Sequence, residues 1–146
     1  VQALAKRRNV PAIEVLGKIG DERAVDTLAD FVDSGNPPLQ KATLRALGEI
    51  GSEETTQGIA NALADEEPAV RSAAARALGL IGDTRAIEPL SDRLADDDEA
   101  NEVRASAVWA LVRIGTERAL SAAAEYDDDR DYTVQFEAER ARDATA

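Results

Sequence analysis

The chain has 146 residues, a length that suits one domain, and its 29 acidic against 17 basic residues give a formal charge of −12. It contains neither cysteine nor histidine, which excludes disulfides, thiolate or imidazole metal ligands, and catalysis by a thiol or an imidazole. No run approaches the roughly 18 apolar residues of a membrane span, and so negative a field repels phosphate backbones. We therefore expect a cytoplasmic protein that binds neither membranes nor nucleic acid.

Two features concern the origin of the chain. The sequence begins at Val1 and has no methionine, so we expect a fragment or a processed product of a longer protein. Only Lys6, Lys18 and Lys41 among the bases are lysines. An acidic surface with few lysines is typical of a protein from a salt-loaded, halophilic cytoplasm, where the screening length falls to about 3 Å in 1 M salt. An ordinary acidic protein from a GC-rich genome is the alternative.

A motif of the form Leu-x-x-Ile-Gly recurs along the chain, in steps of 31, 31 and 33 residues, and ends at Gly20, Gly51, Gly82 and Gly115. The two extra residues fall in an acidic loop at 96–100, where an insertion costs little. A period of this length indicates stacked helical repeats. Within a single domain over 1–146 we place the repeats, at about 10–35, 36–66, 67–99 and 100–130, followed by a terminal helix at 131–146.

The predicted elements begin with a short helix over 1–8, ahead of Asn9, which can cap the helix that Pro11 opens. Each repeat then has two helices. In the third, an apolar stripe at helical spacing runs over 70–81, and a second stripe runs over 86–94.

Between the two helices of each repeat stand a glycine and a capping residue. The glycine closes the first helix in a left-handed conformation. The next residue is an N-cap type in every repeat, namely Asp21, Ser52, Asp83 and Thr116. One turn before the helix end, we interpret Gly17, Gly48 and Gly79 as points where the paired helices approach closely. Val112 takes this place in the fourth repeat, so we expect looser packing or a different angle there.

The terminal helix has a thin apolar edge. Val134, Ala138 and Ala141 continue the stripe, but Glu139 and Arg142 occupy positions that are apolar in the other repeats. A terminating cap and a frayed stub are both compatible with this pattern.

The residues of the third repeat carry a family resemblance. The segment 82–90, Gly-Asp-Thr-Arg-Ala-Ile-Glu-Pro-Leu, with Val70-Arg71 and Ala77-Leu78-Gly79 before it, resembles the short HEAT-like repeat named after phycobilisome lyases. The likeness covers about 10–143 and implies an all-α fold, a right-handed α-α superhelix of about four helix pairs with partial helices at both ends. It also implies that the concave side meets a partner. Deoxyhypusine hydroxylase is similar in architecture and holds two irons on His-Glu pairs, which a chain without histidine cannot reproduce.

The chain offers no pattern typical of catalysis. Its serines have no histidine as base, and no Gly-rich phosphate loop is present. The acidic runs 96–99 and 127–131 are dense enough to attract Ca²⁺ or Mg²⁺, yet they lack the spacing of a calcium loop. Solvated acidic loops are the favoured interpretation and weak cation binding is the alternative. We predict no catalytic residue, no cofactor and no metal site.

The second helices of such solenoids line the concave surface. Residues pointing away from their buried stripe would form an acidic groove, comprising Glu22, Asp26, Asp30, Glu53, Gln57, Asn61, Thr84, Glu88, Asp92, Glu117 and Glu125. The hypothesis is that this groove binds a basic peptide or protein segment. The alternative is that it is only part of a generally acidic surface.

Three aromatic residues stand out. Trp109 aligns with exposed polar positions of the first helices; cover by the C-terminal helix is favoured, and an exposed binding anchor is the alternative. Phe31 and Tyr126 share one column near the ends of second helices, where they either flank the groove as contact residues or pack beside it.

Two arginines open first helices. Arg71 and Arg104 are expected to form ion pairs with loop carboxylates such as Asp65 and Asp96, with anion binding as the alternative. The favoured function for the whole chain is a protein-interaction scaffold or adaptor. Alternatives are a non-catalytic accessory subunit of a lyase-type enzyme and a structural spacer in a larger chain. The sequence does not indicate an oligomeric state.

Overall fold

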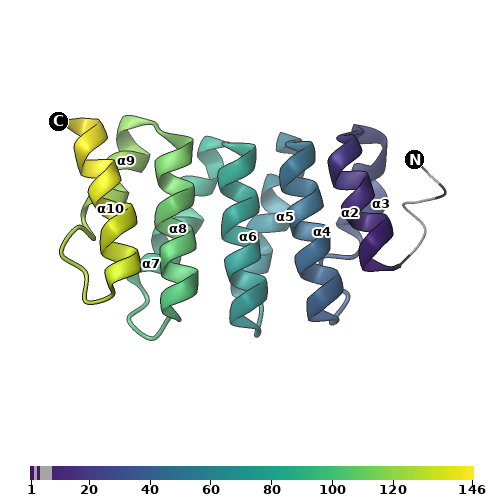
Figure 1. The fold of residues 1–146 in the computed structure, drawn as a ribbon, viewed down its shortest axis with the longest axis horizontal. Coiled ribbons are helices and arrows are strands. Elements are labelled where there is room, and N and C mark those ends of the chain that lie inside the picture. Colours follow the sequence, from purple (N-terminus) through teal and green to yellow (C-terminus); the bar gives the residue numbers. More distant parts are fainter. Residues whose placement is uncertain (2, 4–7) are drawn as a thin grey trace.

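The computed structural model describes residues 1, 3 and 8–146, and within them every regular element is a helix. Figure 1 shows two layers of helices running across the molecule, with the chain ends on opposite sides. The longer first helices form one layer: α2 (Val10–Ile19), α4 (Pro37–Ile50), α6 (Pro68–Ile81), α8 (Asn101–Ile114) and α10 (Tyr132–Thr145). The shorter second helices lie behind them: α3 (Val25–Ala29), α5 (Thr56–Asn61), α7 (Ile87–Ala95) and α9 (Glu117–Ala124). The predicted all-α solenoid is confirmed.

A left-handed glycine ends each first helix of the four repeats. The φ angles of Gly20, Gly51, Gly82 and Gly115 lie between 69° and 77°, and each amide donates to the leucine carbonyl four residues earlier. This conformation strains any residue with a Cβ, by roughly 1–2 kcal/mol. The recurring glycine of the motif therefore marks the turn where the chain passes from one layer to the other.

The residue after each glycine begins the second helix of the repeat. Asp83 accepts a hydrogen bond at 2.9 Å from the amide two residues on, and Asp21 does the same. Thr116 accepts one at 3.2 Å from the amide three residues on. Ser52 departs from the prediction, because its side chain makes no capping bond. In that repeat the Thr55 hydroxyl donates to the Ser52 carbonyl at 2.7 Å and closes the turn instead.

The closest helix contacts join successive repeats. A Cβ placed on Gly48 would lie 2.9 Å from Cα of Ala77, and Gly17 and Gly79 meet the next first helix just as closely. The predicted close approach is confirmed, but its expected place within a helix pair is wrong. At each of these contacts a glycine of one first helix faces an alanine of the next first helix, because only small residues allow two helices to approach so closely. The looser packing expected at Val112 stays a prediction.

The core lies between the two layers and runs along the whole solenoid. Equivalent side chains of successive repeats fill it, each at most 1% exposed: Leu16, Leu47, Leu78 and Leu111 from the first helices, and Leu28, Ile59, Leu90 and Ala123 from the second. Burial of each large side chain contributes roughly 1.5–3 kcal/mol. Because each repeat covers only its neighbours, this stabilisation is additive along the chain. Among the described residues, no helix is long and apolar enough to cross a bilayer.

The two ends of the chain differ from the middle. The helix expected over 1–8 lies largely outside the described residues. At the other end, α10 is a continuous helix that buries Val134, Ala138 and Ala141, as its apolar edge predicts. Arg142 is exposed at a position that is apolar in the other repeats, and it pairs with Asp127 at 3.1 Å.

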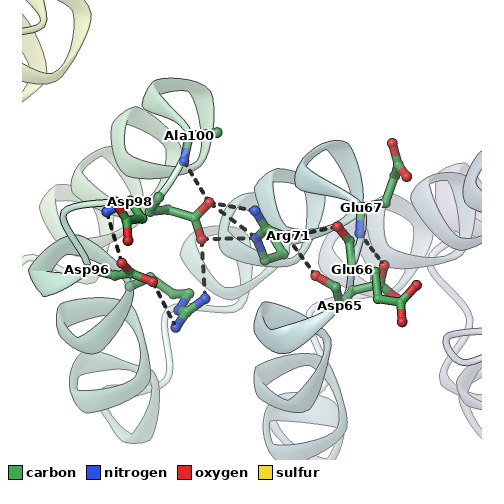
Figure 2. Close-up of polar contacts among 9 residues, drawn as sticks. Asp65, Glu66, Glu67, Arg71, Asp96, Asp98 and Ala100 are labelled. Atoms are coloured by element: carbon green, nitrogen blue, oxygen red, sulfur yellow. Dashed lines mark hydrogen bonds and ion pairs between the residues drawn. The ribbon is translucent and has the colours of Figure 1, made fainter.

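Arginines of the first helices bind the loop of the following repeat. Figure 2 shows Arg71, whose guanidinium pairs with the buried carboxylate of Glu99 at 2.7 Å and donates to the main-chain carbonyl of Asp65. Arg93 also contacts Glu99, at 3.3 Å, and approaches Asp96 at 3.8 Å. The predicted ion pair with a loop carboxylate is confirmed, but the partner of Arg71 is Glu99 rather than Asp65, because the arginine reaches forward to the next loop.

Arg104 repeats this arrangement one repeat later. Its partner is Asp129 rather than Asp96, and both side chains are buried. Burial alone would raise the pKa of Asp129, but the hydrogen bonds from Arg104 and from a main-chain amide outweigh it and lower that pKa. Gln40, in the same column two repeats earlier, donates to Asp65 at 3.0 Å. One side chain in each of α4, α6 and α8 thus ties that helix to the next loop.

Candidate functional site

The polar residues predicted to form a groove are all exposed. They lie on the second-helix side of the molecule, in α3, α5, α7, α9 and the 3-10 turns and short segments that adjoin them. We call this surface the second-helix face; it consists of Glu22, Asp26, Asp30, Glu53, Gln57, Asn61, Thr84, Glu88, Asp92, Glu117 and Glu125.

An acidic cleft lies between α3 and α5 on this side of the molecule. Asp26 and Asn61 line it from the predicted set, together with Asp33 and Glu54, which the sequence interpretation missed. Gly58 also lines it, and a Cβ at that position would meet no atom within 4 Å, so the middle of α5 is open. The signal for Glu54 was present: it stands where the other repeats carry Arg23, Arg85 and Arg118.

A second, shallower cleft continues the surface between α5 and α7. Asn61 lines this cleft as well, opposite Asp92 and Arg93. Asn61 therefore lies between Asp26 and Asp92, and its own amide oxygen accepts a hydrogen bond from Gln57 at 3.2 Å. The structure brings these predicted residues together in a row across three repeats.

The arginines on this side of the molecule are already paired. Arg23 pairs with Asp21 at 2.6 Å, Arg85 with Asp83 at 2.5 Å, and Arg118 with Glu88 at 3.1 Å. Hydrogen bonds from Arg23 and Arg85 lower the pKa of Asp21 and of Asp83 to about 2.

Several carboxylates of the face, and Glu54 beside them, have no such partner among the described residues. Within the part of the chain that the structure describes, no ion pair involves Asp26, Asp30, Glu54 or Asp92. Each is exposed. These carboxylates can accept charge-assisted hydrogen bonds from an incoming cation without first breaking an internal ion pair.

Phe31 is buried and Tyr126 is partly buried. Phe31 is 4% exposed, and the Arg8 guanidinium lies 5.4 Å from its ring centroid, so the hypothesis that it contacts a partner is wrong. Tyr126 is half-buried beneath Arg104, at 5.8 Å, and burial is the main cause of its raised pKa. Phe31 therefore packs beside the face, whereas a contact role for the partly exposed Tyr126 stays a prediction.

Trp109 lies in the other layer. Its ring packs over Gly79 of α6, with Arg76 and Arg113 guanidinium groups at 4.8 and 5.3 Å from its centroid. We expected the C-terminal helix to cover Trp109. The side chain packs instead against the preceding first helix, α6. It remains half-buried.

The acidic loops contain carboxylates that face arginines. Glu99 and Asp129 are bound by Arg71 and Arg104, and Asp127 by Arg142. Across residues 1, 3 and 8–146, no group of three carboxylates is arranged to hold a metal ion. The loops therefore act as anchoring points between repeats.

Comparisons with known proteins agree with this architecture. No curated protein matches the sequence. The solved complex of CpcE and CpcF of phycocyanin lyase from Nostoc sp. PCC7120 is similar, with 25% identity and a TM-score of 0.78 over 92% of this chain and 58% of that chain. This chain thus spans less than two thirds of the length of that lyase chain.

Two further structures share the fold at lower identity. A designed armadillo repeat protein in complex with the peptide (KR)4 is 18% identical, with a TM-score of 0.68 over 99% of this chain and 80% of that one. Human deoxyhypusine hydroxylase is 16% identical, with a TM-score of 0.56 over 92% and 78%.

The family model for HEAT repeats matches residues 9–63, 31–101 and 56–141, which together span nearly the whole chain. These matches fall on the helix pairs and the glycine turns described above. The chain belongs to the HEAT-repeat family, with repeats of the phycobilisome-lyase type.

Proposed function

We propose that this chain is a binding scaffold that holds a basic segment of a partner protein along its second-helix face, which we take to be the concave side. The observation that carries the proposal is the row of unpaired carboxylates, Asp26, Glu54 and Asp92, beside open clefts. Lysine or arginine side chains of a partner would enter these clefts and pair with them. The main chain of Gly58 leaves room for the partner's backbone.

The distribution of charge between the two layers supports a basic partner on the second-helix face. The first helices together carry nine basic and six acidic residues, so the excess acid of the chain lies in the second helices and loops. A uniformly acidic surface would not show this separation. Oppositely charged surfaces speed association and select against acidic partners. The designed armadillo protein bound to (KR)4 shows that a fold of this kind can hold a basic peptide.

We infer further that the chain itself does not catalyse a reaction. It has no thiol or imidazole, and the two carboxyl groups with pKa values of about 2 are held by arginines. Histidine, the side chain whose ordinary pKa lies nearest neutral pH, is therefore not available as a base.

The likeness to CpcE and CpcF favours a second candidate, an accessory subunit that docks onto a lyase-type enzyme whose chemistry lies elsewhere. Such a subunit would use the same face. The two candidates differ in whether the partner carries a chromophore, which the absorbance spectrum of a purified complex would reveal.

Fluorescence anisotropy with a labelled (Lys-Arg)4 peptide tests the binding face. The triple variant Asp26→Lys, Glu54→Lys, Asp92→Lys should lose at least about tenfold in affinity, since three attractive contacts become repulsive. The control variant Glu14→Lys, Glu102→Lys, Asp128→Lys changes the net charge equally at exposed residues outside the face. Equal loss in both variants would mean that the peptide senses only overall charge, and the proposed face would be abandoned.

A further inference from the structure

The opposite side of the solenoid contains a groove of another character. It lies between α4 and α6 and reaches Trp109 of α8. Ala73, Ala77 and Leu80 line it with apolar side chains, and Leu80 is 38% exposed. Tryptophan is enriched at the hot spots of protein interfaces, and here it lies beside an exposed leucine.

Both large apolar residues depart from the repeat pattern. Leu80 stands in a column that is otherwise Lys18, Glu49 and Arg113, and Trp109 in one that is otherwise Glu14, Arg45 and Arg76. In each of these two columns the groove residue is thus the single apolar member among four, and the two columns meet in this groove.

Cations surround the apolar patch. Lys41, Arg45 and Arg76 line the groove, and the Arg113 guanidinium lies 5.3 Å from the centroid of the Trp109 ring. In the described part of the chain, no carboxylate pairs with Lys41, Arg76 or Arg113, while Arg45 pairs with Glu49 at 3.1 Å. A cluster of unpaired bases is unexpected in a chain of charge −12.

The neighbouring groove provides an internal comparison. Between α2 and α4 the equivalent surface is lined by Glu14, Lys18, Arg45 and Glu49, in which acids balance bases. Of these two grooves, only the one formed by α4, α6 and α8 is both basic and apolar. Its character therefore does not follow from the fold.

We propose that this groove binds an acidic peptide segment of a partner protein, with one apolar side chain seated against Leu80 and Trp109 and flanking carboxylates paired with Lys41 and Arg76. Charge complementarity selects the acidic segment, and the exposed leucine and tryptophan select the apolar anchor. The site is independent of the second-helix face. The scaffold would then hold segments of opposite charge on its two faces.

Trp109 is the single tryptophan of the chain, so its emission reports directly on this groove. The probes are 12-residue peptides of glutamate and aspartate with a central leucine, isoleucine or phenylalanine, and a reference peptide with alanine at the centre. At low salt, the apolar-centred peptides should shift the Trp109 emission saturably. The alanine peptide should bind at least about fivefold more weakly, because less apolar surface is buried.

The variant Lys41→Glu, Arg76→Glu should weaken binding of labelled peptide, measured by anisotropy, by about tenfold or more. The matched variant Lys18→Glu, Arg118→Glu removes equal charge at exposed sites outside the groove and should stay within about twofold of the wild type. Circular dichroism checks that both variants are folded. The proposal is overturned if no peptide binds saturably, if the alanine peptide binds equally well, or if the Lys41/Arg76 variant retains affinity. Self-association of the chain that is lost in the same variant would assign the groove to a second copy and also overturn it.

Discussion

Replacing Gly48 with alanine tests the packing between successive repeats. The new Cβ would lie 2.9 Å from Cα of Ala77 and 3.2 Å from its Cβ, so α4 and α6 must move apart. Overpacking of this kind costs about 1–3 kcal/mol, and the higher helix propensity of alanine returns about 1 kcal/mol. We expect a net destabilisation of up to about 2 kcal/mol.

Gly58 provides the matched control, since the same substitution there meets no atom within 4 Å. Gly58→Ala should stabilise the chain by about 0.5–1 kcal/mol through helix propensity alone. Thermal unfolding followed by circular dichroism would separate the two variants by several degrees, because 1 kcal/mol shifts Tm by about 2–4 °C in a domain of this size. If Gly48→Ala were as stable as Gly58→Ala, the close contact between first helices would not be an essential feature of the stacking.

Two further predictions concern ion pairs. Glu99→Ala should destabilise the chain by about 3 kcal/mol in urea unfolding, because Arg71 and Arg93 lose a buried partner. The control Asp98→Ala changes an exposed residue of the same loop and should alter stability by less than about 0.5 kcal/mol. Asp83 has a pKa of about 2 in the folded chain against 3.8 ordinarily, so it stabilises the fold above pH 4 and loses this contribution as pH falls from 4 to 2. Wild type and Asp83→Asn should therefore differ in Tm at pH 6 and converge near pH 2, and a constant difference across that range would contradict the assignment.

The local architecture was predictable because it rests on short-range chemistry. A left-handed turn requires glycine, and an open helix end requires a side-chain acceptor, so Gly82 and Asp83 identify their roles without any knowledge of the fold. Ser52 shows the limit of this reasoning: a residue of the right type stands at the right position, but Thr55 closes the turn.

Contacts between repeats were less predictable. The period shows that Gly48 faces something close, but spacing alone does not distinguish its own second helix from the next first helix. The sequence likewise predicts that Arg71 forms an ion pair. Its partner is Glu99, 28 residues later, and this choice depends on how the inserted loop folds back. Both errors have one cause. The repeat pattern describes the position of a residue within its own repeat, whereas the stacking of repeats determines which residues it contacts in the next one.

The candidate face was predictable in its membership but not in its shape. Helical spacing places Asp26, Asn61 and Asp92 on the exposed side, and they are exposed. It could not show that Asp33 and Glu54 line one cleft together with Asp26 and Asn61. For Trp109 the alignment indicated the correct layer, while the groove beside it depends on side chains from three helices.

The most direct test of the binding proposal is an NMR titration of the ¹⁵N-labelled chain with unlabelled (Lys-Arg)4 peptide. The account predicts saturable shifts of the amides in α3 and α5, with Gly58 among the largest, and small shifts around Trp109 on the opposite side. Shifts spread evenly over the acidic loops, or concentrated in the first helices, would contradict the assignment of the second-helix face as the binding surface.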